Sequence, residues 1–99
     1  MKMSFNYIAD QFVFGNLKKI KHGYLELTDS KGIRYNFGNK SSPLKAQIII
    51  NDPSFTSKLL TNGSSGLGES YINNEFETND LPALIELSAR NINVTYKFS

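Results

Sequence analysis

Residues 23–37 alternate apolar and polar side chains on both sides of a turn pattern, DSKG, at residues 29–32. A period of two sends successive side chains to opposite faces of a strand, and a terminal glycine permits the chain to reverse. The segment therefore predicts a β-hairpin with one buried face. The apolar positions of that face are Leu25, Leu27, Ile33, Tyr35 and Phe37.

The chain after the hairpin predicts a strand and then a helix. NKSSP, residues 39–43, is typical of a loop, and AQIIIND, residues 46–52, predicts a third strand. Asp52 can cap a helix, and Pro53 suits the first helical position, where its missing N–H costs nothing. This helix is expected to end at Asn62-Gly63 and to carry Phe55, Leu59 and Leu60.

A further helix is predicted by NDLPALIELSARN, residues 79–91. Asn79 or Asp80 can cap it. Glu86 and Arg90, four residues apart, are expected on its solvated face. The tail INVTYKF alternates Ile92, Val94, Tyr96 and Phe98 and predicts either a strand or an apolar segment that awaits further chain. The stripe of this helix at helical spacing is Leu81, Leu84, Ile85 and Ser88.

Apolar residues near the N-terminus recur at spacings of three to five, which predicts one or two helical turns facing a core and interrupted near Gly15. Three lysines then fall in the expected last turn, where cations complement the helix dipole, with Gly23 as the helix stop. The same lysines are candidates for contact with lipid headgroups. The apolar residues are Phe5, Ile8, Phe12, Leu17 and Ile20, and the lysines are Lys18, Lys19 and Lys21.

The length of the chain, 99 residues, suits one compact core, so we expect a single domain over residues 1–99. The hydrophobic share of 39% and the charged share of 20% are ordinary for a globular protein rather than a disordered one. The order of the elements predicts a small α+β fold in which helices pack on a mostly antiparallel sheet.

The chain contains no cysteine. This excludes disulfides, thiolate nucleophiles and cysteine-based metal centres, and it permits a reducing compartment. The N-terminal residues lack the long apolar run of a signal peptide, and apolar runs such as residues 48–50 are far shorter than the about 20 residues that span a bilayer. We therefore expect a cytoplasmic protein whose membrane contact would be peripheral, at the inner face.

Charge is unevenly distributed along the sequence. Residues 1–58 carry nine Lys or Arg against four acids, whereas residues 59–99 carry two against five. Such a distribution could favour an anionic partner such as a layer of phospholipid headgroups, although ordinary solvated charge explains it more simply.

The glycine-rich stretch NGSSGLGESYINNEF, residues 62–76, is a candidate cofactor loop, but it matches neither of two known cofactor-binding patterns. The dinucleotide pattern would need a glycine where Tyr71 stands and a buried strand before it. A Walker loop would need a Gly-Lys-Ser/Thr ending. We therefore expect no cofactor at this stretch.

The same stretch has a structural explanation. Gly63 is expected to stop a helix, and Gly66 and Gly68 are expected to turn the chain into a short helix at residues 69–73. Tyr71 and Phe76 are then anchors that hold this turn to the core.

Other residues that could carry chemistry have plainer explanations. His22 has no ligand cluster near it in the sequence and is expected at a helix end. The acids lack the spacing of an EF-hand, which favours solvated or capping roles. Basic residues are not interleaved with exposed aromatics, so no nucleic acid partner is expected. We predict no catalytic residue, cofactor or metal; the acids considered are Glu69, Glu75, Glu77 and Asp80.

Several motifs together carry a family resemblance. They are a hairpin of the form G-x-L-x-L-x-D-x-x-G followed by FG, then I-x-I-x-D/N-P-x-F, a helix ending in NG, and GLGESYINNEFETNDLPALIELSARN. Residues 17–91 thereby resemble the N-terminal region of the cyclopropane-fatty-acyl-phospholipid synthases and their mycolic-acid-modifying relatives. The residues that match the family motif are Gly66, Gly68, Glu69, Tyr71, Phe76 and Asp80.

Three residues depart from the family pattern. Ser70 replaces a usual Ala, Asn74 stands where glycine is common, and Phe76 stands where Trp is frequent. Asn74 can adopt a left-handed turn conformation much as glycine does, and Phe76 keeps an aromatic anchor. The resemblance in fold is therefore preserved.

The resemblance implies a function without catalysis. The family's enzymes methylate double bonds of phospholipid acyl chains, using S-adenosylmethionine bound in a C-terminal Rossmann-like domain, and nothing in this sequence resembles that domain. What is implied is the N-terminal accessory domain, whose fold is similar to sterol carrier protein 2, where a sheet and helices enclose an apolar lipid pocket.

The leading hypothesis is a domain that receives part of a phospholipid or fatty acyl chain, with the lysines turned to anionic headgroups. Each buried CH₂ contributes about 0.8 kcal/mol, so a short groove suffices for weak capture. The alternative is that the same side chains are ordinary core. The expected groove residues are Phe55, Leu59, Leu60, Leu67 and Leu84.

A second hypothesis comes from the interaction class. The domain would dock on a separate methyltransferase domain, or form a homodimer, through GLGESY and the tail at residues 92–98, without binding lipid itself. A third, independent enzymatic activity, lacks a nucleophile, a metal cluster or a cofactor loop in the sequence.

Overall fold

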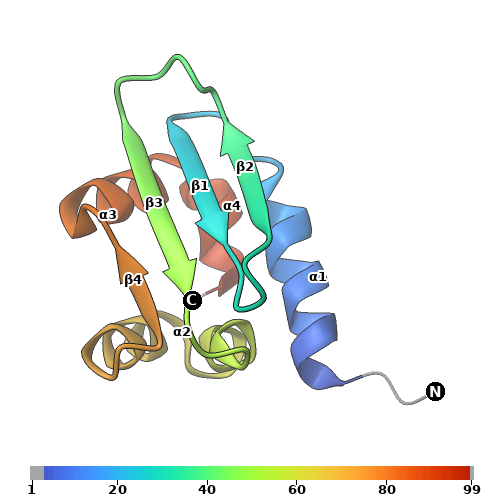
Figure 1. The fold of residues 1–99 in the computed structure, drawn as a ribbon. Coiled ribbons are helices and arrows are strands. Elements are labelled where there is room, and N and C mark those ends of the chain that lie inside the picture. The colour runs from blue at the N-terminus through green and yellow to red at the C-terminus, as the bar shows by residue number, and fades with distance from the viewer. Residues whose placement is uncertain (1–3, 99) are drawn as a thin grey trace.

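The chain folds around a four-stranded sheet with the strand order β2-β1-β3-β4 (Figure 1). The computed structural model describes residues 4–98. Strand β1 (Tyr24–Thr28) pairs antiparallel with β2 (Arg34–Gly38) and parallel with β3 (Lys45–Ile50), and β3 pairs antiparallel with β4 (Phe76–Thr78). Since helices pack on this mostly antiparallel sheet, the predicted α+β class is confirmed.

The predicted hairpin of β1 and β2 is confirmed, and Asp29 builds its turn. Asp29 Oδ1 accepts hydrogen bonds from the backbone N–H groups of Lys31 and Ile33, both at 2.9 Å. Gly32 has a φ of 87°, a left-handed conformation that costs glycine little. Ile33 belongs to the turn and is 51% exposed, so the inward face of β2 begins only at Tyr35.

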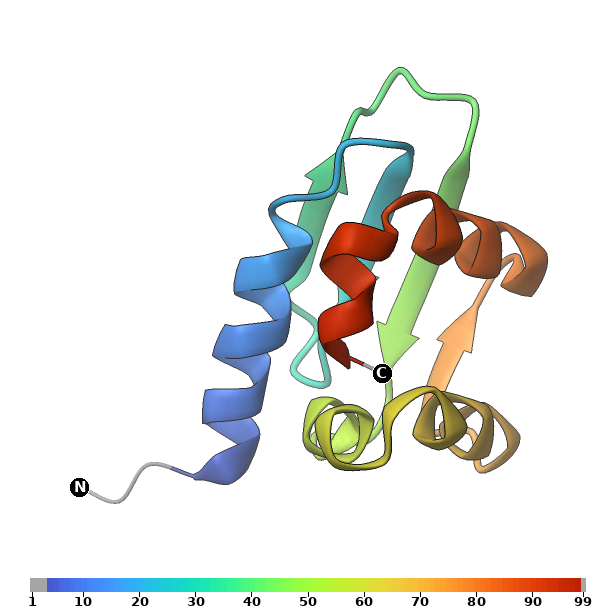
Figure 2. The same cartoon turned by 180° about the vertical axis from the view of Figure 1, so that it is seen from behind.

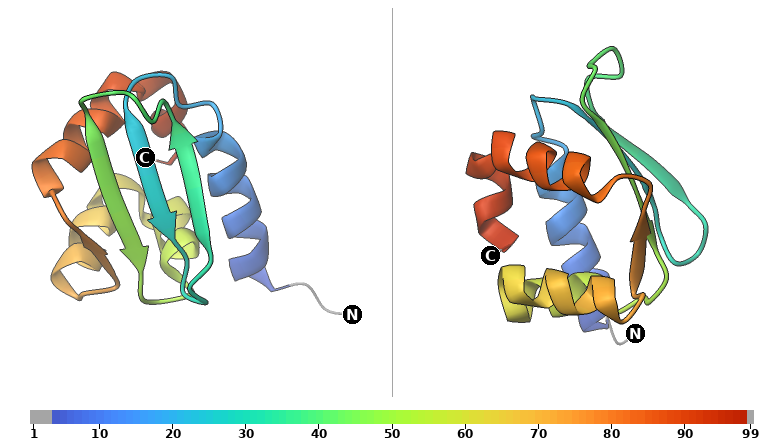
Figure 3. Two further views of the ribbon diagram at one scale, coloured as in Figure 1. Left: turned by 45° about the horizontal axis from the view of Figure 1, so that its top comes forward. Right: turned by 90° about the vertical axis from the view of Figure 1, so that its left-hand side faces the viewer.

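The helices of the described chain cover one face of the sheet (Figures 2 and 3). They are α1 (Phe5–Leu17), α2 (Phe55–Ile72), α3 (Leu81–Arg90), α4 (Ile92–Thr95) and the 3₁₀ turn η1 (Tyr96–Phe98). The core forms between these helices and the covered face, which supplies Leu25, Leu27, Phe37, Ala46, Ile48 and Ile50. The open face of the sheet carries mostly polar side chains, among them Glu26, Asn36 and Gln47.

Helix α1 is longer than expected and ends earlier. Ser4 caps it by accepting from the Tyr7 N–H at 3.2 Å, and the helix runs through Gly15 without interruption. After Leu17, the backbone N–H groups of Lys19 and Ile20 donate to carbonyls three residues earlier, and this tighter turn places Ile20 in the core. The expected place in the last helical turn is therefore wrong for Lys18, Lys19 and Lys21, which all follow the helix.

Leu17 and Ile20 are buried as predicted, but the side of α1 that faces the core was predicted wrongly for the other three apolar residues. Phe5, Ile8 and Phe12 are roughly half exposed, and the core instead receives the face with Ala9 and Val13. Both sets recur at helical spacing, so periodicity alone does not choose between them. Polar residues decide the choice, because Asn6 and Asp10 lie on the face that hydrogen-bonds to α2; the remaining buried residues of α1 are Phe14, Asn16 and Leu17.

Gly63 divides α2 as predicted, but the chain returns to helix at once. Its φ of 63° and ψ of −148° belong to a region that is essentially restricted to glycine. Gly66 and Gly68 lie inside the second segment, so the expected turn is wrong and the short helix begins earlier. A Cβ on Gly66 would lie 2.6 Å from the Asn62 Cβ and 3.1 Å from the Lys58 carbonyl oxygen, so this glycine permits the two segments to meet closely.

Helix α3 begins where predicted, since Asp80 accepts a hydrogen bond from the Ala83 N–H at 3.0 Å. Its buried stripe differs from the prediction, because Leu87 is buried with Leu84 while Ile85 is 57% exposed. A step of one residue turns a side chain by about 100°, whereas a step of three brings it back to within about 60°. The predicted solvated pair of α3 is confirmed, with Arg90 Nε 2.8 Å from Glu86 Oε2.

The tail is helical, so the predicted strand is wrong. The carbonyl of Asn91 accepts the N–H groups of the third and fourth residues after it, which starts α4 directly after α3. Val94 and Phe98 are buried, while Ile92 and Tyr96 are mostly exposed. The four-residue separation within each pair suits one face of a helix, so strict alternation is compatible with helix as well as strand.

Candidate functional site

A largely apolar cavity of about 260 Å³ lies between the sheet and the helices. Apolar side chains of β1, β3 and the helices form its walls, with Thr56, Ser88 and Thr95 as the polar members. Its volume lies between the about 150 Å³ of an engineered cavity that holds benzene and the about 300 Å³ of the smallest ordinary ligand pockets. It is large enough for a short stretch of hydrocarbon.

Four of the five predicted groove residues line this cavity. Phe55 and Leu59 come from the first segment of α2, Leu67 comes from the second, and Leu84 comes from α3. Leu60 packs against the core and is not part of the lining. The contributions of α1 and of the tail were not predicted; these residues are Val13, Phe14, Leu17, Ile92, Thr95 and Phe98.

From the exposure of its lining residues we infer that the cavity reaches the surface between α2 and the junction of α3 with α4. Two lining residues at that junction, Ala89 and Ile92, are exposed, and Ile92 is 62% exposed. Leu59 and Leu67 border the opening from α2 and are half-buried, whereas the other apolar wall residues are buried. The mouth, defined by Leu59, Leu67, Ala89 and Ile92, is therefore apolar.

Asn91 fixes this junction to the connection between α1 and β1. Its side chain is buried, and its Oδ1 accepts the backbone N–H groups of Lys21 at 3.0 Å and His22 at 3.1 Å. Its Nδ2 donates to the carbonyls of His22 at 2.7 Å and Leu87 at 2.8 Å. Both ends of the amide are thus used, and no role for this residue was predicted.

The bonds to Asn91 place the lysine-bearing connection beside the mouth. The predicted headgroup residues lie in this connection and have exposed side chains. The backbone N–H of Lys21 donates to Asn91, the residue directly before Ile92 of the mouth. His22 is exposed and follows α1 by five residues, so its expected place at a helix end is wrong. Gly23, with a φ of 90°, leads into β1 and is not a helix stop; the headgroup residues are Lys18, Lys19 and Lys21.

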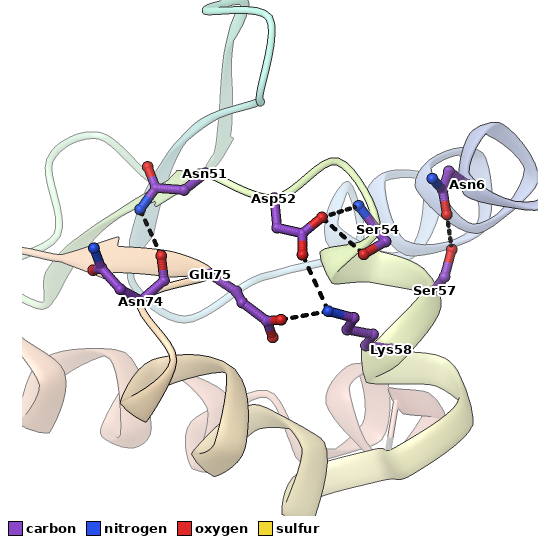
Figure 4. A network of polar contacts seen from close by, with 8 residues as sticks. All are labelled: Asn6, Asn51, Asp52, Ser54, Ser57, Lys58, Asn74 and Glu75. Atoms are coloured by element: carbon purple, nitrogen blue, oxygen red, sulfur yellow. Dashed lines mark hydrogen bonds and ion pairs between the residues drawn. The ribbon is translucent and has the colours of Figure 1, made fainter.

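A polar cluster joins the start of α2 to the start of β4 (Figure 4). Lys58 Nζ lies 3.1 Å from Asp52 Oδ2 and also pairs with Glu75. The Glu75 carbonyl accepts the Asp52 N–H at 3.0 Å. Asp52 Oδ1 accepts both the N–H and the hydroxyl of Ser54. Because α2 begins at Phe55 with Ser54 as its N-cap, the predicted cap at Asp52 and the predicted first helical position at Pro53 are each wrong by two residues.

The cluster holds its groups in their charged forms. The N–H and hydroxyl of Ser54, together with Lys58, lower the pKa of Asp52 to about 2. Lys58 and the Ser70 hydroxyl lower the pKa of Glu75, and the two carboxylates raise the pKa of Lys58. The charged groups of the cluster are paired with one another, which indicates that the cluster holds the start of α2 to the start of β4 rather than forming a reactive site.

We expect Asp52→Asn to weaken the acid dependence of stability. The pKa of Asp52 is lower in the folded chain than its ordinary 3.8, so its contribution is complete above about pH 4 and is lost as pH falls toward 2. Because the side chain is 31% exposed, solvent screening limits this contribution to about 1 kcal/mol. Urea unfolding of the unaltered protein and of Asp52→Asn at pH 6 and pH 2.5 measures this contribution. An equal loss of stability in both proteins between these pH values would contradict the stabilising role of the Asp52 carboxylate.

The family-motif residues lie around α2 and β4. Phe76 is 1% exposed and its ring contacts those of Phe55 and Tyr71, with centroids 5.1 and 5.7 Å away. Asn74 has the left-handed backbone expected of it, with a φ of 58°. The other motif residues are not arranged around a common ligand site. Gly66 and Gly68 lie within α2, Glu69 is exposed, and Asp80 caps α3.

Comparisons with known proteins yield no relative: no family model, curated protein or solved structure matches the chain. Within residues 4–98, no three His, Asp or Glu side chains form a group that could hold a metal ion. No helix in that part of the chain is long and apolar enough to cross a membrane.

Proposed function

We propose that the chain is a non-catalytic, lipid-interacting accessory domain of the kind found at the N-terminus of cyclopropane-fatty-acyl-phospholipid synthases. In this role it holds part of a phospholipid acyl chain and presents it to a methyltransferase domain that uses S-adenosylmethionine. The observation that carries the proposal is the apolar cavity with an apolar mouth.

The chemistry of the cavity favours hydrocarbon over a polar ligand. Thr56 donates its hydroxyl hydrogen to Asp10 at 2.6 Å, and Thr95 donates its own to the Ser88 carbonyl at 2.8 Å. Inside the cavity these hydroxyls therefore offer little to a carboxylate or phosphate. A lipid is expected to enter with its hydrocarbon end first, gaining about 0.8 kcal/mol per buried CH₂, with its polar end outside.

The arrangement of layers supports the likeness to sterol carrier protein 2. Helices cover one face of the sheet and enclose the cavity against it (Figure 3). The absence of catalysis is part of the proposal and is supported by the stretch with Gly63, Gly66 and Gly68, which serves the kink and packing of α2.

We expect Ala89→Phe to weaken binding of a fluorescent fatty acid at least tenfold, because a ring at this position obstructs the mouth. Ala89 is exposed, so the fold should tolerate the change. Ile85→Phe is the matched control, since it adds a ring to an exposed position of the same helix outside the lining. Equal affinities for both variants, or no binding and no co-purified lipid in mass spectrometry of the unaltered chain, would contradict the proposal.

A docking function is favoured by a different surface. Ile72 is 82% exposed and Tyr71 is 44% exposed, side by side near the end of α2. The tail contributes less than expected to such a surface, because Val94 and Phe98 are buried. Gel filtration with and without a methyltransferase domain tests this alternative, which requires that Ile72→Ser abolish a complex seen with the unaltered chain.

A further inference from the structure

The outer surface of α1 carries a stripe of apolar side chains. Phe5, Ile8 and Phe12 are exposed by 56%, 48% and 45%, and their spacings of three and four place them on one side of the helix. The opposite side of α1 is also apolar and is buried in the core. The only charged residue of the helix, Asp10, accepts the Thr56 hydroxyl. We call Phe5, Ile8 and Phe12 the α1 stripe.

The α1 stripe leads to the mouth of the cavity. The Phe12 ring meets the Phe98 ring edge to face, with centroids 6.5 Å apart. Phe98 and Ile92 both line the cavity, and Ile92 forms part of its mouth. Figure 2, which views the molecule from the side covered by helices, shows α1 beside α4. The α1 stripe therefore contacts the wall of the cavity through Phe98.

The segments around the α1 stripe are cationic. Residues 4–22 and 92–98 together contain four lysines and one acid, and that acid is Asp10, which is already hydrogen-bonded. Lys97 reaches Asn16 Oδ1 at 3.2 Å, at the end of α1. Aromatic and aliphatic groups bordered by lysines, without a free carboxylate, complement an anionic lipid surface. The lysines are Lys18, Lys19, Lys21 and Lys97.

We propose that the α1 stripe docks on a bilayer that contains anionic phospholipids, with the lysines among the headgroups and the mouth turned toward the acyl chains. The purpose of this docking rests on the proposed function, because an acyl chain that leaves the bilayer at this surface would enter the cavity without crossing water. The surface itself is defined by its own residues, so its test is separate from the test of the cavity.

The test uses a fluorescent reporter in the full chain, which has no tryptophan of its own. With vesicles of phosphatidylglycerol and phosphatidylcholine, Phe12→Trp is expected to show a blue-shifted emission that lipids with quenchers in their acyl chains reduce. Ile72→Trp, at an exposed position at the other end of the helix layer, is the matched control and should show neither effect. Equal shifts in both variants would overturn the proposed surface.

Sedimentation with the same vesicles measures the contribution of the stripe. Ile8→Asp should lower vesicle affinity at least tenfold, while Ile72→Asp should leave it unchanged, and pure phosphatidylcholine should bind the unaltered chain at least tenfold more weakly. Vesicle binding that survives Ile8→Asp, or a soluble dimer that this substitution dissociates, would overturn the proposal. Fatty acid binding in solution that persists in Ile8→Asp separates failure of the docking surface from failure of the cavity.

Discussion

We expect Asn91→Ala to lower the free energy of unfolding by about 3 kcal/mol. The side chain makes four hydrogen bonds to backbone groups, three of them on Lys21 and His22. A buried backbone group that loses its partner costs about 1–3 kcal/mol. Four such losses would sum to about 4 kcal/mol or more. Since Lys21 and His22 lie at the surface and water can reach part of their backbone, the expected total is somewhat lower than that sum.

The matched control for this prediction is Asn93→Ala. Asn93 has the same side chain, lies two residues further along and is exposed, so its removal should change stability by less than about 0.5 kcal/mol. Urea unfolding followed by circular dichroism compares the two. Losses of similar size would show that the bonds of Asn91 do not stabilise the junction.

Elements whose cause is local could be predicted from the sequence. The hairpin depends on Asp29 and Gly32 within its own turn, and the α3 cap depends on Asp80 and a backbone N–H three residues away. Gly63 breaks α2 through its own backbone angles. In each case the interacting groups lie within a few residues, so the pattern contains most of the physical cause.

Periodicity predicted the wrong face where two faces of a helix are apolar. In α1, the sets that contain Phe12 and Val13 both fit helical spacing, and in the tail the alternation fits a strand and a helix equally. Tertiary contacts decide these cases. Asp10 turns toward Thr56 of α2, and the Asn91 carbonyl starts α4 before a strand can form.

Pairings between distant segments were beyond the sequence pattern. Strand β4 has three residues, too few for alternation to show, and it exists because Phe76 and its neighbours pair with β3. Asn91 bonds to residues about seventy positions earlier, and nothing near it in sequence indicates that partner.

The cavity was predicted in part, for a related reason. Apolar residues such as Phe55 and Leu84 are evident from the sequence, and both line it. The space itself depends on how α1 and the tail approach α2, which is a property of the whole helix layer. Ala89 and Ile92 line the mouth because the chain turns at Asn91 from α3 directly into α4. This turn was not predicted from the sequence, so neither residue was predicted to line the cavity.

We expect Phe76→Ala to cost about 4 kcal/mol, the largest loss among these substitutions. The side chain is 1% exposed, and removing a buried phenyl ring costs about 3–5 kcal/mol through lost contacts and the space left behind. Phe76 also lies opposite Ile50 in the pairing of β4 with β3, and its ring packs between Phe55 and Tyr71. The loss should therefore reach the second segment of α2 as well as the sheet.

Thermal unfolding measures this effect, and a loss of about 4 kcal/mol corresponds to a decrease in Tm of roughly 20 °C for a domain of this size. Phe12→Ala is the matched control, because its ring is 45% exposed and its removal should cost about 1 kcal/mol or less. Hydrogen exchange locates the damage: Phe76→Ala should speed exchange in residues 66–72 more than in the β1–β2 hairpin. Because Phe76 joins that segment to β4, faster exchange confined to the hairpin would contradict its role as the anchor.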